Sequence, residues 1–223
     1  MPGRVLLLAA VAALCGSAWA ALDPDRAPLA VLLVAGAVLA AGAAWLEGGT
    51  ETARELTLVA TLAGLAAAGR VVFAPVPNVQ PVTVIVVAAG VALGPRRGFA
   101  VGALAALASN FFLGQGPHTP WQMLAWGGCG LAAGVARPLL RRRLAFAAFC
   151  CALGLLYGVP MNLYTWLYLP HTEASLLAVL SRGFPFDVAH AIGNLVLALA
   201  VGPELRRVLT RYERRLRTEV VWA

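Results

Sequence analysis

The chain has 223 residues, of which 61% are hydrophobic and only 12% are charged, and its formal net charge is +7. Soluble domains average about 25% charged residues, so this composition excludes an ordinary soluble domain and indicates a polytopic membrane protein. All 17 basic residues are Arg. The lack of Lys excludes a P-loop ATPase and a Schiff-base enzyme, because both need a lysine amine.

Apolar segments follow one another along the chain and predict an all-α membrane helix bundle. A bilayer core of about 30 Å requires about 20 apolar residues per helix. The first segment is alternatively a signal peptide, since Ala18-Trp19-Ala20 resembles a cleavage site. The fourth segment is short, which allows a re-entrant arrangement. We place the eight segments at 5–22, 28–46, 53–72, 80–94, 98–113, 121–137, 144–168 and 186–203.

Arginines are concentrated at 96–97, 137–143 and 206–217, between or after the apolar segments. Cytoplasmic loops of membrane proteins carry such an excess. We therefore expect a multi-pass protein of the cell membrane with both termini in the cytoplasm, and no nucleic-acid partner. The loops 72–80, 114–121 and 169–185 are then outside. The tail, 204–223, mixes Glu and Arg and is expected to form a solvated helix at the membrane surface.

The first outer loop is rich in proline and follows Arg70. A cation within a membrane segment indicates a functional site by default, although an Arg near the end of a span also suits snorkelling to the headgroups. Asn78 and Gln80 add amide groups to this loop. We take Arg70, Asn78 and Gln80 as candidate ligand-binding residues.

The second outer loop, within Gly114–Gly127, is the densest polar and aromatic stretch of the chain. Gln122 and Trp126 are four residues apart and share a helix face. Trp121 is alternatively an anchor at the membrane interface. The candidate ligand-binding residues of this region are Asn110, Gln115, His118, Thr119, Trp121, Gln122 and Trp126.

The third region adds Asn162 and Tyr164 before the loop and a polar stripe after it. Asp187, His190 and Asn194 follow an i, i+3, i+7 pattern, so they share one helix face that should point into the bundle. This stripe fits a clamp between helices as well as a ligand contact. Together, the three regions predict an outward-facing pocket for a flat heteroaromatic or amide-bearing ligand.

Enzyme chemistry finds little support in the sequence. The chain has three histidines and no HExxH motif, so we expect no metal site. The four cysteines lack CxxC spacing, and no Ser lies in the Gly-x-Ser-Gly context of an intramembrane serine protease. We therefore expect no catalytic residues and no cofactor.

Small residues recur every four positions in the third segment, at Ala60 and Gly64 and at Ala63 and Ala67. Such faces let helices approach closely in lipid. They fit docking of another membrane subunit, or alternatively tight packing within the same bundle.

From Glu51 onward the chain resembles the substrate-binding (S) component of energy-coupling factor (ECF) transporters. The resemblance is closest to the cobalamin or cobalamin-precursor type, because of the run Thr119–Gly127, with riboflavin next. The residues that carry it are Ala68-Gly69-Arg70, the Pro-rich loop with Asn78, Gln80 and Pro81, the series Gly90, Gly94, Gly98 and Gly102, then Asn110, Gly114–Gly127, Phe186-Asp187, His190 and Asn194.

This resemblance implies a six-helix core at 51–203 that captures a vitamin or its precursor from outside. It implies docking, through Ala60, Ala63, Gly64 and Ala67, on a membrane coupling subunit that joins two ABC-type ATPase subunits. ATP hydrolysis would then belong to partner chains. The pair of helices at 1–50 is an addition to the family core, and 204–223 is the basic cytoplasmic tail. The alternative is a structural or assembly membrane protein that binds a partner through its outer loops.

Overall fold

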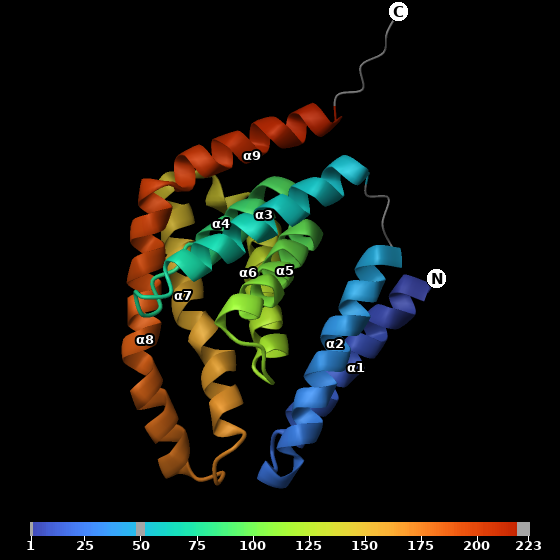
Figure 1. The fold of residues 1–223 in the computed structure, drawn as a ribbon, viewed down its shortest axis with the longest axis vertical. Helices are drawn as coiled ribbons and strands as arrows, with labels where there is room; N and C mark the ends of the chain where they lie inside the picture. The colour runs from blue at the N-terminus through green and yellow to red at the C-terminus, as the bar shows by residue number, and fades with distance from the viewer. Residues whose placement is uncertain (1, 48–51, 218–223) are drawn as a thin grey trace, which may run out of the picture.

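The computed structural model describes residues 2–47 and 52–217, and every regular element in these ranges is helical. The expected boundary between 50 and 51 lies outside the described residues. Figure 1 shows the helices packed as one bundle, with an N-terminal hairpin beside it and a last helix across one end. The elements are α1 (Pro2–Ala20), η1 (Pro24–Arg26), α2 (Ala27–Glu47), α3 (Ala53–Val72), α4 (Val82–Leu93), α5 (Pro95–Leu113), α6 (Thr119–Ala136), η2 (Leu139–Arg141), α7 (Arg143–Trp166), α8 (Glu173–Ala200) and α9 (Gly202–Arg217).

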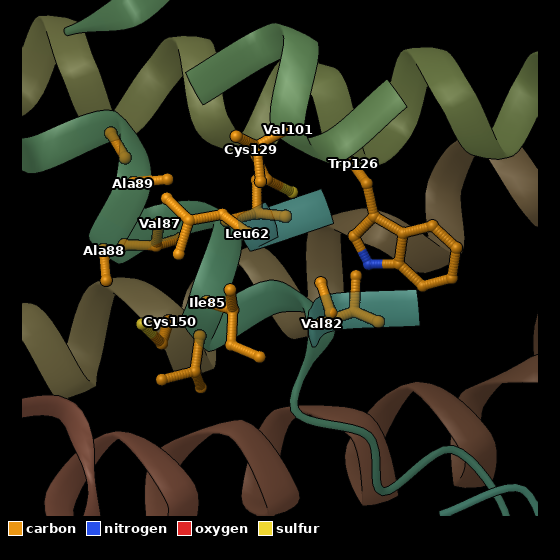
Figure 2. Packing of buried hydrophobic residues seen from close by; sticks show 14 of the residues in the cluster. Leu62, Val82, Ile85, Val87, Ala88, Ala89, Val101, Trp126, Cys129 and Cys150 are labelled. Carbon is orange, nitrogen blue, oxygen red and sulfur yellow. The ribbon is translucent and has the colours of Figure 1, made fainter. Parts of the chain in front are cut away.

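The short helix α4 forms the centre of the core. Almost all of its residues are buried, and the helix is apolar on every side, as expected for a helix enclosed by others. Figure 2 shows Val82, Ile85 and Val87 of α4 among side chains of the surrounding helices, such as Leu62 and Val101. At about 1.5 Å per residue, its twelve residues extend only about 18 Å, too short to cross a bilayer core.

Glycines allow α4, α5 and α6 to approach one another closely. A Cβ atom added at Gly90, Gly98 or Gly130 would lie under 3.0 Å from backbone atoms of a facing helix. Gly94 and Gly114 end α4 and α5 with positive φ angles of 91° and 105°, a conformation that L side chains rarely adopt. The glycine series of the sequence therefore serves helix packing and helix termination.

Five helical segments are long and apolar enough to cross a membrane, within α1, α2 with its preceding turn, α3, α7 and α8. Helices form at all eight expected positions, and five of them meet this criterion of length and apolar composition. The expected span 80–94 is the short, enclosed α4. The protein is a membrane-embedded helix bundle, and the exposed leucines and valines of its outer helices fit contact with lipid.

The α7–α8 hairpin differs from the expectation. Most of the expected outer loop 169–185 is helix, because α8 begins at Glu173 with a capping box in which Thr172 and Ser175 bond each other's backbone. Pro160 and Pro185 lie inside α7 and α8 without ending them. The expected helix in the tail is present as α9, which packs on α4, α7 and α8 (Figure 1).

The N-terminal hairpin of α1 and α2 lies to one side of the bundle (Figure 1) and contacts it chiefly through α6. Ala20, Ala27 and Ala30 form a small apolar cluster with Leu167, and Trp121 packs against it. At its other end, the Trp45 carbonyl of α2 accepts a hydrogen bond from Arg96 of α5, so the hairpin contacts the bundle at both ends.

Candidate functional site

Arg70, in the last turn of α3, is the centre of a buried polar network. Its side chain is only 7% exposed. Its Nη1 atom donates to Ser109 Oγ at 2.6 Å and to Asn110 Oδ1 at 2.5 Å, and Nη2 approaches Gln122 Oε1 at 3.4 Å. The guanidinium also lies over the Trp126 ring, 4.8 Å from its centroid, in cation–π geometry. These partners hold the cation inside the bundle instead of letting it snorkel to the surface.

Asn110 connects Arg70 to the start of α6. Its Nδ2 atom donates to Gln122 Oε1 at 2.8 Å and to Thr119 Oγ1 at 2.9 Å, while its Oδ1 atom accepts from Arg70. The Thr119 hydroxyl donates in turn to Gln115 Oε1, across the turn between α5 and α6. Asn110 therefore uses both ends of its amide to fix this turn against α3.

An aromatic row leads from Arg70 towards α8. Trp126 packs on Tyr157 with ring centroids 4.5 Å apart, and Tyr157 packs on His190 at 5.3 Å. Thr83 of α4 links the two ends of this row: its Oγ1 accepts from Trp126 Nε1 at 3.2 Å and lies 3.0 Å from His190 Nε2. The row thus has a fixed orientation, because both its first and last rings bond one hydroxyl.

The Pro-rich turn between α3 and α4 lies against the middle of α8. Asn78 Nδ2 donates to the Phe186 carbonyl at 3.1 Å, and His190 Nδ1 lies 2.7 Å from the Asn78 carbonyl. Phe186 is thirteen residues into α8, about 20 Å from the start of this helix. The turn was expected in an outer loop at 72–80, and the structure places it well along α8 instead.

These elements enclose a cavity of about 250 Å³. It brings together predicted residues from all three polar regions, which are far apart in the sequence. Its lining is Arg70, Asn78, Gln80, Gln122, Trp126, Tyr157, Gly158, Met161, Asn162, Gly183, Phe186, Asp187 and His190.

On the side of the cavity away from α3, polar side chains of α7 and α8 contact each other. Asn162 Nδ2 donates to Asp187 Oδ2 at 3.1 Å. A Cβ atom added at Gly158 would lie under 3.0 Å from the Asp187 carboxylate, and one added at Gly183 would do the same to the Asn162 amide. Each glycine therefore leaves room on one helix for the polar side chain of the other.

Several predicted residues lie outside the cavity lining. His118, Trp121 and Tyr164 form a second aromatic group where α6 begins and α7 ends, with ring centroids of Trp121 and Tyr164 6.1 Å apart. Asn194 is fully buried beside Gly154, and its amide has no hydrogen-bond partner among the described residues. The stripe of Asp187, His190 and Asn194 thus faces inward, but only Asp187 and His190 line the cavity. Asn110, Gln115 and Thr119 lie outside the lining and are joined to one another by hydrogen bonds.

The four small residues proposed for docking do not share one surface. Ala63 and Ala67 are buried against the bundle, so they pack internally and are not available to a partner. Ala60 and Gly64 are exposed, and a Cβ added at Gly64 meets nothing within 4 Å. The exposed small-residue face is therefore limited to Ala60 and Gly64, with Ala68 one turn further on.

Three functional positions were missed from the sequence. Thr83 is the only hydroxyl residue in the apolar α4, and that isolation was the available signal. Ser109 precedes Asn110 and faces Arg70, which the sequence alone does not reveal. Tyr157 belongs to an aromatic-rich helix, and only the fold shows that it lies between Trp126 and His190.

The arrangement can bind a small polar ligand. It offers a guanidinium, a carboxylate, amides and a wall of aromatic rings, the groups that orient a small ligand within a largely apolar bundle. Among residues 2–47 and 52–217, no group of three or more His, Cys, Asp or Glu side chains is placed to hold a metal ion.

Comparison with known proteins gives a family but no described activity. No curated protein and no solved structure matches the chain. One family matches residues 50–205, which cover α3 to α8 and the start of α9, and therefore the whole cavity. The chain belongs to this family, DUF6580, a family of unknown function.

Proposed function

We propose that the protein is the substrate-capture subunit of an ECF-type importer in the cell membrane. The observation that carries this proposal is the cavity of about 250 Å³, lined by charged, amide and aromatic groups inside a membrane-embedded bundle. Polar groups inside such bundles are costly and are kept where they serve a function. Arg70 and Asp187 would contact the ligand directly, and Trp126 and Tyr157, which line the cavity, would form its aromatic wall.

The cavity volume bears on which ligand is captured. Cavities of about 300–1,000 Å³ hold drug-sized molecules, and cobalamin is far larger than these. A cavity of about 250 Å³ therefore favours a vitamin or precursor much smaller than cobalamin.

The proposal assigns delivery to partner chains. A membrane coupling subunit would dock on the exposed small-residue face of α3 at Ala60 and Gly64, and two ABC-type ATPase subunits would supply the energy. The basic α9 would lie on the cytoplasmic side.

Docking is tested by introducing a bulky side chain at an open position. Gly64→Trp should abolish uptake of the bound vitamin while leaving binding by the purified protein unchanged, because Gly64 lies outside the cavity and has open space around it. Gly36→Trp on α2 is the matched control, since this glycine is also exposed with no atom within 4 Å of an added Cβ. Full uptake by Gly64→Trp would contradict docking at this face.

A further inference from the structure

The cavity contains a cation and a carboxylate that do not pair with each other. Arg70 and Asp187 both line it, and no ion pair joins Arg70 to a carboxylate among the described residues. Burying a charge without a counter-charge is costly. We propose that the ligand supplies the missing charges: a small organic anion that Arg70 binds at one end, with N–H donors at the other end for Asp187. This inference rests on the capture function proposed above and names its substrate class.

The three guanidinium nitrogens of Arg70 differ in their hydrogen bonds to the protein. Nη1 has two acceptors at 2.5–2.6 Å, in Ser109 and Asn110. On the other edge of the guanidinium, Nε has no acceptor and Nη2 has only the long contact of 3.4 Å to Gln122 Oε1. The Nε and Nη2 edge is the fork that binds a carboxylate with two parallel hydrogen bonds.

Gln122 is placed to yield to such a ligand. Its Oε1 atom lies 2.8 Å from Asn110 Nδ2, so it keeps a strong hydrogen bond if a carboxylate oxygen replaces it at Arg70 Nη2. The ligand would then neutralise the guanidinium, whose Nε atom is buried with no hydrogen-bond partner in the described part of the chain. A neutral carbonyl at this edge would leave the charge uncompensated.

The Asp187 carboxylate can accept further hydrogen bonds from a ligand. One of its oxygens accepts from Asn162 at 3.1 Å, and no other hydrogen bond to its carboxylate occurs among the described residues. Gly158 allows the carboxylate to lie close against α7, at the rim of the cavity. A carboxylate with free acceptor sites selects N–H or ammonium groups and repels a second anion.

The aromatic row of Trp126, Tyr157 and His190 lies between the charged groups of Arg70 and Asp187. Arg70 lies over Trp126, Tyr157 lies between Trp126 and His190, and His190 follows Asp187 by one helical turn. The two charged groups are therefore at opposite ends of a row of tilted aromatic rings. A flat molecule lying on this row would present its anionic group to Arg70 and its far end to Asp187.

The test compares acids with their neutral amides on the wild-type protein in lipid nanodiscs. The probes are nicotinate with nicotinamide, biotin with biotinamide, and two neutral or larger vitamins, riboflavin and cobalamin, with binding measured by calorimetry. An acid should bind about 10- to 100-fold more tightly than its amide, the range expected for one charge-assisted hydrogen-bonded pair. Adding a donor, in 6-aminonicotinate, should tighten binding further.

Two variants assign the effects to residues. Arg70→Gln should remove the preference for the acid, and Asp187→Asn should remove the gain from the amino group. Arg182→Gln is the matched control, because Arg182 is an exposed arginine of α8 outside the cavity lining. The comparison of acid with amide on wild-type protein decides the inference even if a variant fails to fold.

The outcomes separate this inference from the capture function. An amide that binds as tightly as its acid, or binding of riboflavin or cobalamin alone, would overturn the anionic substrate class and leave capture intact. Equal affinity for nicotinate and 6-aminonicotinate would overturn the role of Asp187. Failure of every probe to bind would overturn both proposals.

Discussion

Asn110 should be a main stabilising residue of the bundle, and its loss can be estimated from its contacts. Asn110→Ala removes one hydrogen bond from the Arg70 guanidinium and two neutral ones, to Thr119 and Gln122. Charge-assisted bonds contribute about 1.5–3 kcal/mol, and neutral ones between membrane helices about 0.6 kcal/mol each. The better helix propensity of Ala returns about 0.6 kcal/mol. We expect a net loss of about 2–3.5 kcal/mol in the free energy of unfolding.

The matched control is Asn162→Ala. Asn162 also lies in a membrane helix, but its side chain makes one hydrogen bond among the described residues, to the Asp187 carboxylate, and it is only partly buried. The bond to the Asp187 carboxylate is charge-assisted but only partly buried, so it contributes about 1.5 kcal/mol, the low end of that range. With the same gain in helix propensity, the net loss should be about 1 kcal/mol. Unfolding by SDS titration in mixed micelles, followed by circular dichroism, measures both. Losses that agree within 0.5 kcal/mol would refute the assignment of Asn110 as the organiser of the Arg70 network.

Three further predictions follow from other contacts. Gly158→Ala should displace the Asp187 carboxylate and weaken binding of 6-aminonicotinate at least about tenfold by calorimetry; unchanged affinity would contradict the place of Asp187 at the cavity rim. Thr83→Val should cost about 1–3 kcal/mol in the same SDS titration, since it leaves Trp126 Nε1 and His190 Nε2 without the hydroxyl; a cost near zero would contradict this link. In cells, an impermeant maleimide should label Gln115→Cys from outside and Thr210→Cys only after permeabilisation, and the reverse pattern would invert the proposed orientation.

The sequence was a good guide to where helices lie and a poorer guide to how far they extend. Apolar runs located α1 to α8, because an unbroken hydrophobic stretch has few other structures available in a membrane. The start of α8 was misjudged by thirteen residues, because the Thr172 capping box begins the helix well before the expected position 186. The helix packs along α7 and continues through Pro185.

The site was predictable in its chemistry but not in its connections. Arg70, Gln122, Trp126, Asp187 and His190 were all singled out as polar groups in membrane helices, and they line one cavity. Pattern alone does not tell a lining residue from a supporting one, so Asn110 and Asn194 were grouped with them. Telling lining residues from supporting ones requires knowing which side of each helix faces its neighbour.

Residues at the α6–α7 end show the same limit. His118, Trp121 and Tyr164 have the composition of a binding site, but they form a separate aromatic group next to the N-terminal hairpin. The pairs Trp121–Tyr164 and Trp126–Tyr157 both join α6 to α7 and look alike in sequence. Only the structure shows that the second pair lines the cavity and the first does not.

The most direct test of the central claim is native mass spectrometry of the protein purified from vitamin-replete cells. The account predicts a single co-purifying small molecule on wild-type protein and on Arg182→Gln, and its loss from Arg70→Gln. Wild-type protein that carries no molecule and also binds none of the vitamin probes would contradict capture by the cavity. That result would favour the structural or assembly role, in which the polar groups only hold the helices together.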